Sequence, residues 1–390
     1  MLRFERGTAP WWMRLLLPVA AIVVTFALAS LVILASGTNP LEVFTEMLIG
    51  PLTRRTARFE VLVQATPLLL TGVAVAVAFR AGYYNIGADG QLYAGAMAAA
   101  LVGPLLAGFP AFLAIAVMLA AGALAGLLWA LGPALLKVRA KVDEVVTTLL
   151  LNSVMLFFVS AMLNGPWRDP ISGWPRSPAI AVAAQFPVLV PRTRVHFGLL
   201  VALTLVVLLG WALAKMRFGL DLRAVGHGRE AARFMGIDVD RTVLTAALLS
   251  GAVAGIAGVS EVAGLHHYLI EGISPGYGYT GIIVATFGGL HALGVTLAAA
   301  FLALVDVGAL SASRTLGIPS YLGQVVQATL LLVTLAVLLL NRYRPKRRVG
   351  EPGSTPAAID SDPTSPSSGL PREPDAQSSA TSATEVPGWN

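Results

Sequence analysis

Long apolar runs alternate with short polar stretches over most of this chain. A transmembrane helix needs about 20 mainly apolar residues, and ten segments approach that pattern, eight continuous and two broken by glycine. They predict an all-α polytopic membrane protein with about ten transmembrane helices. The continuous segments are Leu15–Ala35, Val61–Phe79, Phe109–Leu131, Val145–Leu163, Leu199–Ala214, Val243–Val262, Val295–Leu310 and Gly323–Leu340, and the glycine-broken ones are Leu92–Ala107 and Gly281–Leu290.

The order of these segments repeats. Val61–Phe79 is followed by a glycine-tyrosine turn at Gly82–Gly87, then by a glycine-broken segment and two spans. Val243–Val262 is followed by a similar turn at Gly276–Gly281 and the same succession. With ten spans the first set starts outside and the second inside, so the two halves would be inverted copies. Inverted repeats with interrupted helices are typical of transporters, in which the interruptions mark the pathway.

The charge distribution fits this arrangement. Hydrophobic residues make up 56% of the chain and charged residues only 12%, against about a quarter charged in soluble domains. Of the 27 lysines and arginines, 18 lie in segments placed inside and eight in segments placed outside, and Arg372 lies in the distal tail; this bias predicts cytoplasmic N- and C-termini. The same bias explains the net charge of +6 better than nucleic-acid binding does.

The domain organisation follows from these segments. We expect a cytoplasmic N-terminus at 1–14, a transmembrane domain at 15–341 and a disordered cytoplasmic tail, rich in Pro and Ser, at 342–390. Two loops stand out: an external one at 164–197 and a cytoplasmic one at 215–241.

The cytoplasmic loop is a polar island between two apolar runs. Within it, residues 229–235 predict a short helix with Ala231, Phe234 and Met235 on one face and charged residues around the rest. Gly236 is a natural stop. An apolar stripe with a charged rim suits a docking element for a soluble partner, and a merely solvated loop is the alternative.

The polar stretch Phe79–Gln91 is a candidate for the solute pathway. Asn85, Asp89 and Gln91 offer hydrogen-bonding groups near membrane depth, where polar side chains usually face a bundle interior or a watery cavity. Helix–helix packing with a capped turn explains the same residues.

A second polar stretch, Glu261–Tyr279, gathers carboxylates and imidazoles. Glu261, His266, His267 and Glu271 could supply a proton relay or a metal site. Without helical ligand spacing or a second cluster, hydrogen-bonded structural polarity is the simpler interpretation, and no metal is predicted.

Three further polar residues lie in or beside the apolar segments. Tyr277 and Tyr279 could stack on a ring-shaped solute, or lie at the membrane interface as tyrosines often do. Asp306 stands alone inside its apolar run, and an intramembrane acid is a functional candidate by default, although one hydrogen-bond partner would make it structural.

The sequence lacks the residues and motifs of several common catalytic and binding sites. There is no cysteine, which excludes disulfides and thiolate sites. No Gly-x-x-x-x-Gly-Lys-[Ser/Thr] motif occurs, so the chain does not bind ATP through a P-loop, and neither His-Glu-x-x-His nor Gly-x-Ser-x-Gly is present. We therefore expect no cofactor and no ATPase site of its own; a membrane enzyme stays an open alternative class, although nothing in the sequence names a nucleophile or a metal set.

Four runs, in this order, resemble signature segments of a known family: YYNIGADGQ, DEVVTTLLLN, RAVGHGREAARFMGIDV and LHHYLIEGISPGYGYTGIIVA. They are similar to permease subunits of ATP-binding cassette (ABC) importers in the branched-chain amino acid/simple sugar permease superfamily, nearest to nucleoside or simple-sugar permeases. The resemblance covers Val61 to Leu340.

This resemblance implies partners and a location. A permease of this kind works with a cytoplasmic ABC ATPase, a second homologous permease subunit and an extracellular substrate-binding lipoprotein, in the bacterial cytoplasmic membrane. The solute would be a nucleoside, with simple sugars as the alternative. An ion-coupled secondary transporter is the competing class, prompted by Asp89, Glu261 and Asp306.

The resemblance also places the contact with the ATPase in the polar island, although His227 and Gly228 depart from the family pattern there. The residues predicted for ATPase coupling are Gly226, Arg229, Glu230, Ala231, Ala232, Phe234 and Gly236. Those predicted for the solute pathway are Asn85, Asp89, Gln91, Glu261, His267, Tyr277 and Tyr279.

Overall fold

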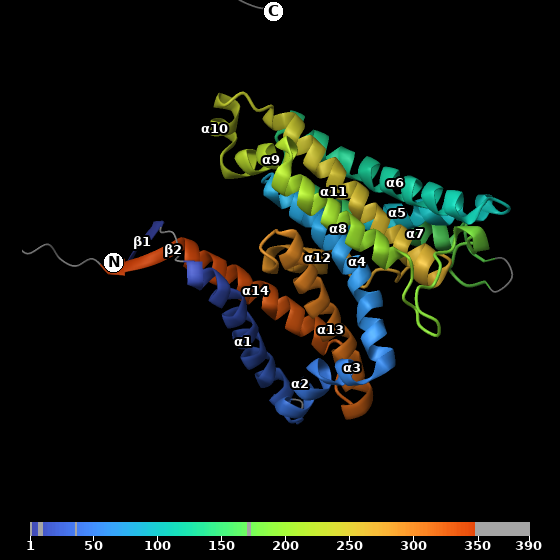
Figure 1. Ribbon diagram of the computed structural model, residues 1–390, viewed down its shortest axis with the longest axis horizontal. Helices are drawn as coiled ribbons and strands as arrows, with labels where there is room; N and C mark the ends of the chain where they lie inside the picture. Colours follow the sequence, from blue (N-terminus) through green and yellow to red (C-terminus); the bar gives the residue numbers. More distant parts are fainter. Residues whose placement is uncertain (1, 7–10, 36, 170–172, 348–390) are drawn as a thin grey trace, which may run out of the picture. The chain divides into compact units, whose positions relative to one another are not determined.

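The structure is a computed structural model that describes residues 2–6, 11–35, 37–169 and 173–347. Helices dominate it (Figure 1), and the two described end segments form short strands that pair with each other. The elements are β1 (Leu2–Arg6), α1 (Trp11–Ala35), α2 (Pro40–Leu48), α3 (Gly50–Thr53), α4 (Arg55–Arg80), α5 (Ala88–Val102), the 3-10 turn η1 (Gly103–Leu106), α6 (Ala111–Ala140), α7 (Glu144–Asn164), the 3-10 turn η2 (Val182–Ala184), α8 (Gly198–Lys215), α9 (Arg217–His227), α10 (Arg229–Phe234), α11 (Val239–Glu261), the π turn η3 (Val262–His266), α12 (Tyr277–Phe287), α13 (Ala292–Leu316), α14 (Leu322–Arg342) and β2 (Tyr343–Arg347).

The predicted all-α class is confirmed, and every predicted apolar segment falls on a helix. Six helices among the described residues are long and apolar enough to cross a membrane: α4, α6, α7, α8, α11 with its π turn, and α13. The described apolar parts of α1 and α14 are shorter, at Val19–Ala35 and Leu322–Val337. Length and composition thus identify six candidate crossings among the described residues, and the remaining four of the ten expected are not confirmed.

The two glycine-broken segments form short helices that begin earlier than predicted. α5 has 15 residues and α12 has 11, or about 22 and 17 Å at the usual rise, less than the roughly 30 Å of a bilayer core. Hydropathy misplaced their starts because Asp89, Gln91 and Thr280 lie inside the first turns.

The helical core is built around α4 and α11. In the span windows, 83% of α4 is buried, against 22% for each of α6 and α7, so α4 is a central helix. α11 packs on α5 and α6 with backbone in contact: a Cβ built on Gly255 would lie 2.1 Å from the carbonyl oxygen of Gly122. Such small residues let membrane helices approach closely.

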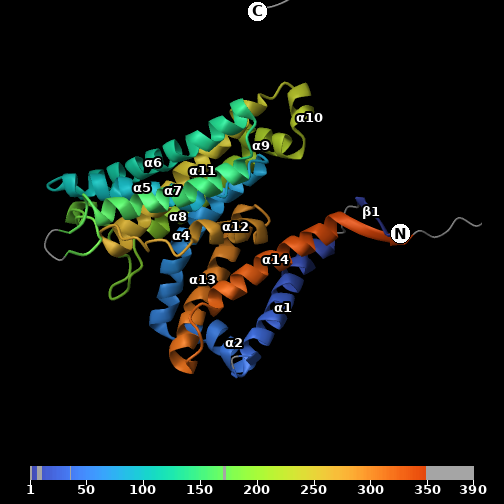
Figure 2. The same cartoon turned by 180° about the vertical axis from the view of Figure 1, so that it is seen from behind.

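The two ends of α11 carry different structures, as Figures 1 and 2 show. α9 and α10 lie at its N-terminal end, and the 164–197 segment lies at the other. That segment is tied to the chain after α11, since Ile180 N donates to His267 O at 2.9 Å and Phe186 N donates to Ala263 O at 2.8 Å. The predicted tail beyond Arg347, and residues 1 and 7–10 of the predicted N-terminal segment, lie outside the described residues.

Candidate functional site: a polar cavity and an exposed helix

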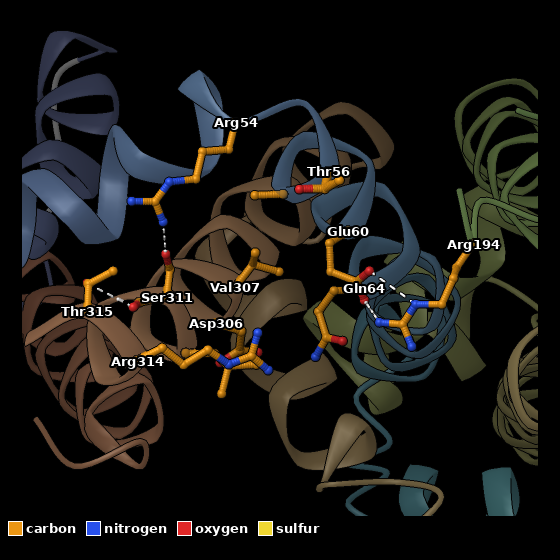
Figure 3. Close-up of a pocket in the computed structure, with 12 residues that line it drawn as sticks. Arg54, Thr56, Glu60, Gln64, Arg194, Asp306, Val307, Ser311, Arg314 and Thr315 are labelled. Atoms are coloured by element: carbon orange, nitrogen blue, oxygen red, sulfur yellow. Dashed lines mark hydrogen bonds and ion pairs between the residues drawn. The ribbon is translucent and has the colours of Figure 1, made fainter. Parts of the chain in front are cut away.

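A cavity of about 380 Å³ opens between α4, α13 and the segment that leads into α8. Figure 3 shows its side chains converging from these elements. We call it the α4–α13 cavity, and its size is within the usual range for small-molecule sites. Its described lining residues are Arg54, Thr56, Ala57, Glu60, Gln64, Arg194, Asp306, Val307, Leu310, Ser311, Arg314 and Thr315.

A hydrogen-bond network among four helices includes two of the lining residues, Gln64 and Asp306. The Tyr277 hydroxyl of α12 donates to Gln64 Oε1 of α4 at 3.1 Å. Gln327 of α14 donates from Nε2 to Asp306 Oδ1 of α13 at 2.5 Å. The Thr280 hydroxyl of α12 completes the network by donating to Gln327 Oε1 at 3.2 Å.

Ion pairs fix the walls of the cavity. Arg194 pairs with Glu60 on α4. Arg54 Nη1 contacts Glu46 Oε1 at 2.7 Å and the Ser311 hydroxyl at 2.7 Å. Arg314 of α13 extends into the cavity (Figure 3) and has no ion pair within the described chain.

The N-termini of the two short helices α5 and α12 meet beside this network. Asp89 Oδ1 accepts from Gly278 N at 3.0 Å and from the Ser274 hydroxyl at 2.7 Å. A Cβ built on Gly278 would lie 2.1 Å from Asp89 N, so only glycine permits this contact. One carboxylate thus caps α12 while lying in the first turn of α5, where helix dipoles favour negative charge.

Other predicted pathway residues hold the start of α5 in place. Asn85 and Gln91 form a reciprocal amide pair at 2.9 and 3.2 Å, and Asn85 also donates to the Ser250 hydroxyl at 2.9 Å. Asn152 of α7 accepts from Gly90 N at 2.8 Å and donates to the Tyr279 hydroxyl at 3.1 Å. None of these side chains lines the α4–α13 cavity, and their role in the pathway stays a prediction.

Glu261 and His267 lie in a buried polar cluster at the end of α11. Glu261, Ser260 and His196 are each 1% exposed, and each has a buried polar atom without a hydrogen-bond partner among the described residues, as His267 does. No group of three or more potential ligands in the described chain could hold a metal ion. Burial, and to a smaller extent the charge of His267, lowers the pKa of His196 to about 4.

The sequence pointed to part of this site and missed the rest. Asp306, the lone acid of its apolar run, has the Gln327 amide as a hydrogen-bond partner. Gln64 and Gln327 were not singled out, although each is a polar residue within a predicted apolar segment, and Thr280 directly precedes one. A search for every polar residue in the spans would have found Gln64 and Gln327, since such residues rarely face lipid.

The predicted short helix in the polar island is confirmed as α10. It begins after Gly228 and ends before Gly236, whose φ of +81° suits glycine. Phe234 is 96% exposed and Met235 65%. With Glu230, Ala231 and Arg233, which are also exposed, they form what we call the α10 surface.

The other predicted coupling residues anchor α10 to the body. Ala232 is fully buried against Val225, Val239 and neighbouring apolar residues. Arg229 Nη2 donates to Gly82 O at 3.0 Å, just beyond the C-terminal end of α4. A Cβ on Gly226 would lie 2.1 Å from the carbonyl oxygen of Arg80. The helix α4 therefore contacts the α10 region at one end and lines the cavity near the other.

The fold defines a polytopic membrane protein with a polar cavity between its helices. The chain belongs to the family described as "Branched-chain amino acid transport system / permease component", which matches residues 57–335. The predicted family is thereby confirmed.

Individual relatives show high coverage. A glucose ABC transporter permease of Haloferax volcanii is 35% identical over 349 residues, 87% of this chain and 92% of that protein. A guanosine ABC transporter permease of Bacillus subtilis is 35% identical over 327 residues, 82% of this chain and 92% of that protein. A nucleoside ABC transporter permease of Lactococcus lactis is 28% identical, with 86% and 94% covered. No solved structure matches the chain.

Proposed function

We propose that this protein is the permease subunit of an ABC importer and forms half of a translocation pathway for a nucleoside or a simple sugar. The family and the glucose and guanosine permeases among its relatives support this. The observation that carries the proposal is the position of α4, which lines the polar cavity with Glu60 and Gln64 and whose C-terminal end contacts the α10 region, at Arg80 and the following Gly82. Movement of α10 can thus be transmitted to the cavity through one buried helix.

Ten membrane crossings in two inverted halves are part of the proposal. α5 and α12 each follow a long helix and an irregular segment, and their N-termini meet at Asp89 and Gly278. Asn152 of α7 holds the start of α5, and Gln327 of α14 holds that of α12. This correspondence between the halves supports two discontinuous helices at mid-depth, each counted as a crossing.

The energy source is a separate subunit in this proposal. The chain has no P-loop, and the α10 surface presents a large aromatic side chain that is almost fully exposed. A hollow of about 430 Å³ adjoins it, lined partly by Phe218, Asp221 and Arg241. A cytoplasmic ABC ATPase would dock here, with a second permease subunit beside the chain and a substrate-binding lipoprotein on the opposite face.

Replacing Phe234 by Asp tests the docking. Phe234 makes no buried contact, so the variant should insert and fold normally, while a charge in the docking interface should reduce ATP-dependent uptake at least about tenfold. Uptake of labelled guanosine and glucose, with co-purification of the ATPase, is the measurement. Phe234→Leu is the matched control and should retain coupling. Normal uptake by a well-expressed Phe234→Asp protein would contradict docking of the ATPase at α10. Uptake by the protein in the absence of any ATPase would indicate an ion-coupled transporter instead.

A further inference from the structure

The Asp306 carboxylate is held rigidly at the deep side of the α4–α13 cavity. Gln327 of α14 donates to it at 2.5 Å. On α14, Gly323 leaves room for it, since a Cβ there would lie 3.2 Å from Asp306 Oδ1. A carboxylate offers about four lone-pair sites, so this amide partner leaves acceptor capacity for a ligand.

Gln64 offers a donor beside this acceptor. Its Oε1 accepts from Tyr277, which fixes the orientation of the amide and turns both N–H bonds away from that contact. An amide nitrogen has two N–H bonds to give, and Gln64 lines the cavity together with Asp306. The cavity therefore presents a fixed acceptor and a fixed donor side by side, a combination that suits hydroxyl groups because each hydroxyl both donates and accepts.

The other lining residues argue against a nucleobase or a charged solute as the ligand of this cavity. None of its described lining residues is aromatic, so a nucleobase finds no ring to stack on. Arg194 is balanced by Glu60 and Arg54 by Glu46, while Arg314 and Asp306 offset one another in number of charges. A lining without excess charge suits a neutral solute rather than a phosphate.

We propose that the α4–α13 cavity binds the hydroxyl groups of a sugar ring, with Asp306 as acceptor and Gln64 as donor, and that it does not recognise a nucleobase. The proposal rests on the proposed permease function and concerns its specificity. The ring can be a free sugar or the ribose of a nucleoside, since both present vicinal hydroxyls. Asp306 and Gln64 would then be specificity-determining residues.

The test compares solutes with and without ring hydroxyls in the assembled transporter. Uptake of guanosine, 2′,3′-dideoxyguanosine, ribose and glucose is measured in proteoliposomes at saturating loaded receptor, with receptor affinity for each solute determined separately. The wild type should carry guanosine about 10- to 100-fold faster than the dideoxy analogue, as expected for lost hydrogen bonds to a charged group. Asp306→Asn should abolish most of this preference by slowing guanosine and leaving the analogue unchanged.

Controls separate this result from misfolding and from failure of the proposed function. Thr334→Val, on the same helix as Gln327, removes a buried hydroxyl that has no partner within the described residues and should leave uptake unchanged. If Asp306→Asn fails to assemble, Gln64→Leu is used instead and should likewise reduce the preference for guanosine over the dideoxy analogue. Uptake of ribose or glucose identifies a free sugar as the solute, and uptake of guanosine alone identifies the nucleoside ribose. The sugar-ring site is overturned if the ratio of guanosine to dideoxyguanosine uptake is unchanged in both variants, or if both solutes are slowed equally. The proposed function is overturned if the wild type carries none of the four solutes.

Discussion

At the scale of single residues, His196 shows how burial sets a protonation state. Its Nδ1 accepts from Gly198 N at 3.2 Å, so the neutral ring carries its proton on Nε2. The ring is 1% exposed and closely packed, because a Cβ on Gly264 would lie 2.3 Å from Nδ1. Protonation of Nδ1 would break the hydrogen bond from Gly198 N and place a positive charge in a buried, closely packed site.

The depressed pKa of His196 predicts that the folded state weakens in acid. The pKa is about 4 in the folded protein and about 6.5 in the unfolded chain. Protonation thus favours unfolding, and the contribution is present above pH 6.5 and lost as the pH falls toward 4. At pH 5 the loss is about 2 kcal/mol. Thermal unfolding in detergent between pH 7.5 and 4.5 measures it, and His196→Gln should flatten the profile. Identical pH slopes for the two proteins would refute this account.

The sequence identifies single polar residues that are unusual in an apolar segment, but it does not identify the residues that they contact. Asp306 is recognisable from the sequence as an acid in an apolar run. That it hydrogen-bonds Gln327 and lines one cavity with Gln64 depends on the packing of α4, α13 and α14. No periodicity in one helix contains that information.

At the scale of elements, hydropathy located the helices and misjudged the short ones. Continuous apolar runs such as Phe109–Leu131 fall on α6 because only a helix satisfies its own backbone in lipid. α5 and α12 begin with polar or glycine-rich turns that partner side chains stabilise, such as Asn152 at Gly90. Their starts therefore depend on tertiary contacts that a sequence window does not see.

The packing of α11 on α6 yields a prediction with a matched control. Gly255→Ala places a methyl group where the Gly122 carbonyl oxygen lies, so the helices must separate, at about 1–3 kcal/mol or more. Gly132→Ala is the same change on α6, but nothing lies within 4 Å of its Cβ. That variant should be neutral or gain up to about 1 kcal/mol from helix propensity. Melting temperatures in detergent decide the matter, and equal values for the two variants would show that α11 and α6 are not in close contact.

At the scale of the whole molecule, the separation of the α10 surface from the 164–197 segment supports alternating access driven from one side. The helix α4 bridges them, since Arg194 pairs with Glu60 near its start and Arg229 contacts Gly82 beyond its end. Charge counts in the sequence predict opposite membrane faces for these two segments, and that orientation stays a prediction. The sequence could not anticipate that a single buried helix connects them, because that follows from the fold.

The proposed placement of these two segments on opposite sides of the membrane can be tested directly because the chain has no cysteine. Val182 is 83% exposed in the 164–197 segment, and Arg233 is exposed on α10. In intact cells a membrane-impermeant maleimide should label Val182→Cys and leave Arg233→Cys unlabelled, since the charge bias predicts that α10 is cytoplasmic. Opening the cells should expose Arg233→Cys to the same reagent. Labelling of both residues from outside would contradict the proposed topology, and with it a cytoplasmic motor acting on α10.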